Sequence, residues 1–179
     1  MASESGRKEV LVESDFLFGL RSGDKHHGDV NRVLSLSRKG ILEISVLSSA
    51  VVEVRATLYS RGLKFNEVEN SIALMDAMLS EAGAKNYVSI KLSDAVLSEI
   101  LRSQFDELTF FDSLHAAISK RVGIPLLSGD PIYNKIGVTT TSYEELENDG
   151  NQESISERDE VDTHSVKHRK SLIKKPQSR

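Results

Sequence analysis

The chain has 179 residues, of which 39% are hydrophobic and 28% charged, and its formal net charge is −4. That length suits one domain of ordinary size with some chain to spare. No apolar run approaches the roughly 20 residues that span a bilayer, and residues 1–9 are too polar for a secretory signal. Without cysteine, disulfides, Cys-based zinc sites and thiol nucleophiles are excluded. We therefore expect a soluble, cytoplasmic protein with no membrane association, whose chemistry uses oxygen and nitrogen ligands.

Short apolar runs of strand length alternate with segments of helical periodicity in the first 143 residues. Strands are expected at 10–12, 42–47, 87–90, 124–127 and 138–141. Helices are expected at 16–20, 30–36, 48–62, 65–82, 93–105 and 111–122. Ser48 and Ser49 are the expected N-cap candidates of the third helix, and Gly123 is expected to end the last one. The alternation predicts an α/β fold, a three-layer sandwich with a central, mostly parallel sheet of four to five strands.

The end of the chain differs in composition from the rest. Beyond residue 143, all nine acidic residues lie at or before Asp162, and six basic residues follow it. This segment has no aromatic residue and no helical or strand period, so it cannot bury enough apolar area to offset chain entropy. We expect residues 1–8 to be disordered, 9–143 to fold and 144–179 to form a disordered charged tail. Alternatively, nucleic acid or a partner protein contacts its basic half through Lys167, Arg169, Lys170, Lys174 and Lys175.

Carboxylates follow the expected strands. Glu13 and Asp15 come after the first strand, and Asp130 comes after the fourth. Glu53 lies one turn into the helix after the second strand, and Asp112 begins the helix that leads into the fourth. In an open parallel sheet, ligands bind beyond the carboxyl ends of the strands. These acids are therefore candidates for one shared site.

Each acid also has a structural interpretation. Asp15 could cap the first helix, and Asp130 precedes a proline, as an N-cap residue often does. Thr109 and Asp112 have the spacing of a capping box. Glu53 fits a structural role less well, because its neighbours on the helix face are small and no cation lies on that face.

Taken together, the acids are better explained as a metal site. Converging carboxylates repel one another unless a divalent cation joins them. Magnesium prefers oxygen ligands, keeps several waters and is completed by substrate phosphate oxygens. Such a site suits phosphodiester hydrolysis, because the cation activates a water and stabilises the charge on the phosphate oxygens. The sequence thus predicts a Mg²⁺ or Mn²⁺ site formed by Glu13 or Asp15, Glu53, Asp112 and Asp130.

These motifs resemble a PIN domain, most of all the VapC-type ribonuclease toxins and their archaeal relatives. The similarity is strongest in FDSLHAA at residues 111–117 and GIPLLSGD at residues 123–130. The family has an Asp before an Ala-rich helix here, then a strand and a Thr/Ser-x-Asp ending. Asp112 matches the helix acid, and Ser128 and Asp130 match the ending.

The resemblance covers roughly residues 9–141 and includes a second motif, in which Ser48 and Ser49 are followed by Glu53. The first motif departs from the family, which usually has Asp-Thr-(Ser/Asn/Asp) at the end of the first strand. The register places Glu13 at the catalytic Asp, whereas the commoner strand-end ligand chemistry favours Asp15. Strand alternation would point both side chains the same way, so both stay candidates.

The resemblance implies a metal-dependent endoribonuclease in which these acids hold one or two Mg²⁺ or Mn²⁺ ions. Ser128 would support Asp130 through a hydrogen bond. Arg21, Lys25 and Arg55 would hold the RNA backbone in a local groove, because the near-neutral charge does not favour a broad basic face. The family also implies a homodimer and a small antitoxin protein as partner, for a chain that acts as a toxin or as an RNA-processing enzyme.

Two alternatives remain open. The first is a catalytically inactive PIN-like module that binds RNA or protein, which the departure at Glu13 favours. The second is a phosphorelay receiver domain, which shares the α/β architecture and an acidic pocket. A receiver would need a lysine at the end of its last strand, and residues 138–141 (VTTT) contain none.

Overall fold

The computed structural model describes residues 7–84, 86–146 and 148. Its centre is a five-stranded sheet in the order β3-β2-β1-β4-β5, in which every pairing is parallel. The strands are β1 (Lys8–Val12), β2 (Leu42–Leu47), β3 (Asn86–Val88), β4 (Leu126–Leu127) and β5 (Thr140–Thr141). The predicted α/β class and parallel sheet are confirmed.

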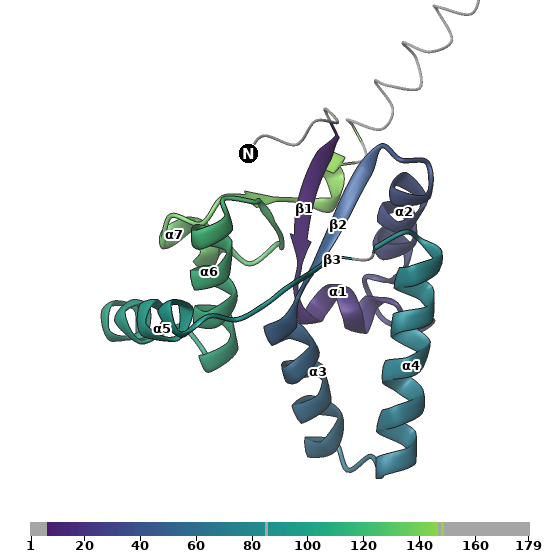
Figure 1. The fold of residues 1–179 in the computed structure, drawn as a ribbon, viewed down its shortest axis with the longest axis horizontal. Coiled ribbons are helices and arrows are strands. Elements are labelled where there is room, and N and C mark those ends of the chain that lie inside the picture. The colour runs from purple at the N-terminus through teal and green to yellow at the C-terminus, as the bar shows by residue number, and fades with distance from the viewer. Residues whose placement is uncertain (1–6, 85, 147, 149–179) are drawn as a thin grey trace, which may run out of the picture.

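Helices connect the strands and flank the sheet. They are α1 (Ser14–Gly19), α2 (His27–Arg38), α3 (Ser48–Ser60), α4 (Phe65–Glu81), α5 (Leu92–Gln104), α6 (Phe110–Val122) and α7 (Pro131–Lys135). Figure 1 shows α5, α6 and α7 on one side of the strands and α2 and α4 on the other. None of these described helices is long and apolar enough to cross a bilayer.

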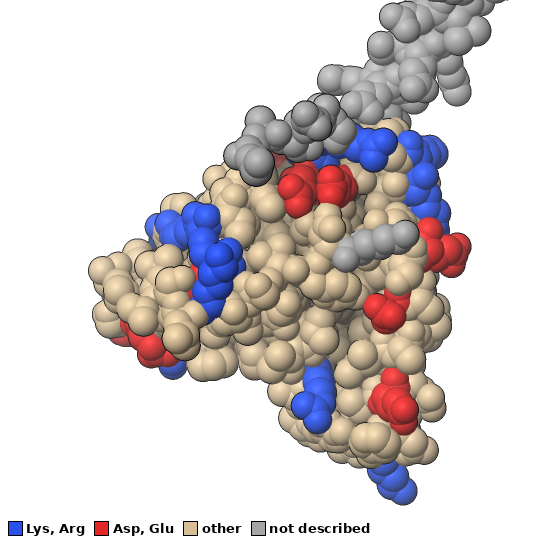
Figure 2. Space-filling model, in the orientation of Figure 1, with Lys and Arg blue, Asp and Glu red and all other residues tan. Residues whose placement is uncertain are grey.

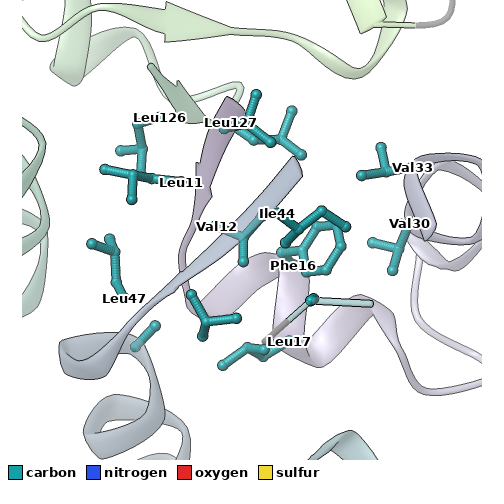
Figure 3. Close-up of a cluster of buried hydrophobic side chains, with 14 of the residues drawn as sticks. Leu11, Val12, Phe16, Leu17, Val30, Val33, Ile44, Leu47, Leu126 and Leu127 are labelled. Carbon is teal, nitrogen blue, oxygen red and sulfur yellow. The ribbon is translucent and has the colours of Figure 1, made fainter. Parts of the chain in front are cut away.

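The core is built around the central strand β1. Val10, Leu11 and Val12 are fully buried, as expected for a parallel strand covered on both faces. In Figure 3, Phe16 of α1 and Ile44 of β2 are both among the buried side chains of the core. This packing fixes the start of α1 against the ends of β1 and β2, where the candidate acids lie.

The sequence correctly indicates the residues at the ends of two helices and is wrong about the cap of a third. Gly123 ends α6 in the left-handed conformation at φ 73°, which favours glycine. Asp130 caps α7 by accepting a hydrogen bond from the backbone of Ile132. The serine N-cap predicted for α3 is wrong, because β2 runs directly into the helix and Leu47 occupies the cap position. The hydroxyl of Ser49 is instead buried in the interior.

The folded part extends beyond residue 143, where the sequence placed its end. The backbone N–H of Ser142 donates to the carboxylate of Glu145 at 2.9 Å, and the N–H of Glu145 donates to Ser142 Oγ at 3.2 Å. One turn later, Leu146 is only 2% exposed and belongs to the core. Its assignment to the tail is therefore wrong. The predicted disorder of residues 1–8 is wrong for Lys8, which begins β1 and pairs with Leu42 of β2. For residues 1–6 and for the tail beyond residue 148 the predicted disorder lies outside the described residues, as does the predicted basic contact.

Candidate active site

Glu13 lies at the junction of β1 and α1, where its side chain caps the helix. Its Oε2 accepts hydrogen bonds from the backbone N–H of Asp15 at 3.0 Å and from Ser14 Oγ at 3.1 Å. Glu13 is buried, with 7% of its surface exposed, whereas Asp15 is exposed in the first turn of α1. The expected strand alternation does not apply to this pair, because β1 ends at Val12.

Glu53 lies on α3, one turn after β2, and faces the same region. Its Oε2 is buried without a hydrogen-bond partner in the described part of the chain, and 22% of its side chain is exposed. Burial raises the pKa of Glu53, and the negative charges of Asp112 and Asp15 raise it further, while the Ser14 hydroxyl lowers it. The charges of Asp15 and Asp112 therefore act on the carboxylate of Glu53.

Asp112 lies in the first turn of α6 and forms the capping box that the sequence predicted. Its Oδ2 accepts hydrogen bonds from Thr109 Oγ1 at 2.6 Å and from the Thr109 backbone N–H at 3.3 Å. Its own N–H donates to Thr109 Oγ1 at 3.2 Å, which completes the predicted capping box. Its other oxygen, Oδ1, accepts from the hydroxyl of Tyr133 at 3.3 Å. Capping therefore positions this carboxylate and does not exclude a role in the site.

The electrostatics of the buried groups describe one acidic centre. Burial raises the pKa of Glu13 to about 7, and the charges of Asp15 and Glu53 also raise it, against the lowering effect of its two hydrogen bonds. Tyr133 is 2% exposed, and its pKa is raised by burial and by the charges of Asp112, Glu13 and Glu53. Four of the five predicted acids, Glu13, Asp15, Glu53 and Asp112, thus influence one another electrostatically.

Asp130 is the predicted acid that does not join this group. It is exposed, and its Oδ1 accepts the N–H of Ile132 at 2.9 Å as the cap of α7. Ser128 does hydrogen-bond to Asp130, but to its backbone: the Asp130 N–H donates to Ser128 Oγ at 3.2 Å. Since β4 pairs with β1, Asp130 follows the sheet at the same edge as Glu13.

The predicted RNA-binding residues form no hydrogen bond or ion pair with the candidate acids in the described part of the chain. Arg21 lines a cavity of about 650 Å³ bounded by residues of α3 and α4. Lys25 is exposed, and the guanidinium of Arg55 lies 5.6 Å from the ring centre of Tyr59. On the face shown in Figure 2, basic side chains form separate groups and no continuous band.

The donor set fits a divalent cation, although the described residues contain no group of three or more His, Asp or Glu side chains placed to hold one by themselves. The available donors are carboxylate oxygens, the ligand type that Mg²⁺ prefers, and Mg²⁺ is usually held by one or two carboxylates with several waters. Glu53 Oε2 is buried and unpaired. A cation beside Glu53 and Asp112 would remove the repulsion between these acids.

Sequence reasoning missed two residues that contact the acids. Ser14 lies between two candidate acids, and its position directly after the strand was the available signal. Tyr133 gave no such signal, because its hydrogen bond to Asp112 joins α7 to α6 across 21 positions. A third residue, His115 of α6, is fully buried and lies 3.6 Å from the carboxylate of Glu53.

Comparisons with known proteins find similarity in structure and none in sequence. No family model matches the chain, and no curated protein matches it. The structure is similar to VapC20 of Mycobacterium tuberculosis, a sarcin-ricin loop cleaving toxin, at a TM-score of 0.55 and 15% identity, covering 74% of this chain and 98% of that one. It is similar to VapBC2 of Rickettsia felis, solved bound to a DNA fragment from its promoter, at a TM-score of 0.56 and 15% identity over 75% and 98% of the chains. PAE2754 of Pyrobaculum aerophilum gives a TM-score of 0.51 and 19% identity over 80% and 90%. At these identities the likeness shows a shared fold.

Proposed function

Because the chain has the fold of a VapC-like PIN domain, we propose that it is a metal-dependent endoribonuclease and the toxin of a toxin–antitoxin pair. The observation that carries this proposal is the buried Oε2 of Glu53, which has no hydrogen-bond partner among the described residues and belongs to a carboxylate that Asp15 and Asp112 influence electrostatically. Glu13 is buried and Glu53 is half-buried. Acids in such surroundings that repel one another are costly to a fold, so they need a compensating role.

The proposed reaction is hydrolysis of an RNA phosphodiester bond to a 5′-phosphate and a 3′-hydroxyl. A bound Mg²⁺ or Mn²⁺ ion would activate the attacking water and stabilise the charge that develops on the phosphate oxygens. The residues that would hold the ion are Glu13 or Asp15, Glu53 and Asp112. Asp130 caps α7 at the same edge of the sheet and would reach the ion only from its exposed side.

Other side chains hold these acids in place. Thr109, the N-cap of α6, binds one oxygen of Asp112, and Tyr133 of α7 binds the other. These two contacts fix the plane of the carboxylate. Ser14 donates to Glu13, and Ser128 accepts from the backbone of Asp130. Arg21, Lys25 and Arg55 would bind the RNA backbone outside the acidic centre. A small antitoxin and a second copy of the chain are the proposed partners, in the cytoplasm.

The alternative function is that of a binding protein with the same fold and no catalytic activity. In an inactive PIN-like module, the domain would bind RNA or a protein without cutting. Two observations favour it: Glu13 replaces the usual Asp of the family and caps α1, and Asp130 caps α7. Cleavage and its dependence on metal separate the two functions.

The test uses the purified full chain and single-stranded RNA with Mg²⁺ or Mn²⁺, with and without EDTA. Asp112→Asn keeps an oxygen to accept from Thr109 and removes the negative charge. Asp76→Asn is the matched control, because Asp76 is exposed and accepts from a tyrosine hydroxyl as Asp112 does. We expect Asp112→Asn to reduce cleavage by orders of magnitude and Asp76→Asn to leave it unchanged. Full activity in Asp112→Asn, or cleavage in EDTA, would contradict the proposal.

The same assay decides which acid belongs to the first motif. Glu13→Gln removes a buried charge, and Asp15→Asn removes an exposed one. We expect the larger loss of cleavage from Glu13→Gln, because its carboxylate lies within the buried centre and interacts with that of Glu53. A loss confined to Asp15→Asn would assign Asp15 instead.

A further inference from the structure

Four buried polar atoms without hydrogen-bond partners lie on two adjacent helices. They are Ser49 Oγ and Glu53 Oε2 of α3, and Nδ1 and Nε2 of His115 of α6, and they are the complete set in the described part of the chain. Ser49 and Glu53 are four positions apart and therefore share a face of α3. Nε2 of His115 lies 3.6 Å from Oε2 of Glu53. Oε2 of Glu53 and Nε2 of His115 thus face one another across the contact between α3 and α6.

Buried polar atoms without hydrogen-bond partners destabilise a fold, so those of Glu53 and His115 need an explanation. A buried donor or acceptor without a partner costs about 1–3 kcal/mol, and His115 places two nitrogens where none of its surface is exposed. Leucine would fill a similar space without that cost. A residue present only for packing would therefore be improved by such a replacement, whereas histidine supplies an N–H that leucine lacks.

The orientation of the ring suits a donor to Glu53. The ring of Phe111 lies against it, with 6.4 Å between centroids and 32° between planes. A neutral imidazole carries one N–H, which can lie on either of its two ring nitrogens. In the tautomer that carries the proton on Nε2, the N–H points at the carboxylate of Glu53. The separation of 3.6 Å exceeds a hydrogen bond by a few tenths of an ångström, and catalytic hydrogen bonds are often long until the ligand is bound.

We propose that His115 is a positioning residue, which orients the carboxylate of Glu53 toward the divalent cation by donating a hydrogen bond from Nε2 to Oε2. This inference rests on the proposed function, because Glu53 is one of its metal ligands. Carboxylates that bind metals are themselves held by hydrogen bonds, and removing such a partner typically costs 10–100-fold in metal affinity or activity. His115 would be that partner for Glu53, as Tyr133 and Thr109 are for Asp112.

Three substitutions separate positioning from packing. His115→Leu keeps the volume and removes both nitrogens. In His115→Gln the amide nitrogen can reach the place of Nε2, whereas in His115→Asn the shorter side chain reaches only the place of Nδ1. Gln and Asn are equally polar, so their comparison stands even where the leucine variant folds poorly. Circular dichroism and the melting temperature report the fold of each variant.

The main readout is Mn²⁺ affinity of the full chain, measured by electron paramagnetic resonance of the unbound ion, with kcat and KM for RNA cleavage beside it. We expect His115→Leu to weaken Mn²⁺ binding about tenfold or more and to lower kcat more than it raises KM. His115→Gln should restore most of both, and His115→Asn should not. In a Glu53→Gln background, His115→Leu should have no further effect.

The result that would overturn the inference is Mn²⁺ affinity within about twofold of the wild type in His115→Leu, or equal behaviour of the Gln and Asn variants. If the wild-type chain still binds Mn²⁺ and cleaves RNA in that experiment, the inference alone is wrong. If the wild-type chain neither binds Mn²⁺ nor cleaves RNA, the proposed function is wrong and the role of His115 falls with it.

Discussion

The hydroxyl of Tyr133 donates a hydrogen bond to Oδ1 of Asp112 at 3.3 Å and thereby links α7 to α6. Thr109 binds the other oxygen of the same carboxylate. Asp112 is therefore held by one contact from its own helix end and one from a separate element. Since α7 begins directly after Asp130, the tyrosine also joins the two family motifs that contain the predicted acids.

Tyr133→Phe should weaken both the fold and the site. Tyr133 is buried, and hydrogen bonds to charged groups contribute about 1.5–3 kcal/mol. Because this bond is long, we expect a loss of about 1–2 kcal/mol of unfolding free energy, measured by urea denaturation. Cleavage of RNA should fall about tenfold, because Asp112 loses one of the two contacts that fix its orientation.

Tyr87→Phe is the matched control for that variant. It removes another tyrosine-to-aspartate hydrogen bond, from Tyr87 to Asp76 at 2.9 Å, but at an exposed position. It should change stability by less than about 0.5 kcal/mol and leave cleavage unchanged. If the two phenylalanine variants behave alike, the Tyr133 hydroxyl has no special role.

Glu13 should make the stability of the metal-free protein depend on pH. Its pKa is raised by burial from 4.5 to about 7, so the folded state holds its proton over a range in which the unfolded chain has released it. The stabilising contribution is therefore complete below pH 4.5 and is lost as pH rises through 7. Between pH 5 and 8 this group alone should reduce the unfolding free energy by about 2–3 kcal/mol.

The comparison is with Glu13→Gln, measured in EDTA by urea denaturation at both pH values. Glutamine keeps an oxygen that can accept from Ser14 and from the backbone of Asp15, but it does not titrate. The variant should therefore gain stability relative to the wild type as pH rises. Parallel pH curves for the two proteins would mean that Glu13 is well solvated in solution.

Millimolar Mn²⁺ should raise the melting temperature of the wild-type chain. A ligand that binds only the folded state stabilises it by an amount that grows with ligand concentration over Kd, about 2.7 kcal/mol at a hundredfold excess. The gain should disappear in the double variant Glu53→Gln, Asp112→Asn, because the two charges nearest the unpaired oxygen of Glu53 are then gone. A gain of the same size in that variant would place the ion elsewhere on the chain.

The sequence predicted the features that depend on short stretches of chain. Alternating apolar runs gave the strands and helices of the sheet, and Gly123 and Asp130 marked helix ends because their roles are local. It could not decide between Glu13 and Asp15, since that choice depends on whether the strand ends at Val12 or two residues later.

The contacts that complete the site are tertiary and carry no local pattern. His115 meets Glu53 only because α3 packs on α6, and Tyr133 meets Asp112 only because α7 returns to the same place. Leu146 was assigned to the tail for a related reason. One apolar residue in a charged segment gives no periodicity, although the structure buries it.

The end of the folded domain can be tested by truncation. A chain that ends at Ser142 loses Leu146, which is 2% exposed, and the two hydrogen bonds between Ser142 and Glu145. Burying a leucine contributes about 1.5–3 kcal/mol, so this truncation should lower the melting temperature by about 5–10 °C.

A chain that ends at residue 148 keeps those contacts, and its melting temperature should stay within about 2 °C of the full chain, because the charged remainder lacks the apolar residues of a core. Leu146→Ala in the full-length chain should reproduce most of the loss seen at Ser142. Equal melting temperatures for the two truncations would restore the domain boundary at residue 143.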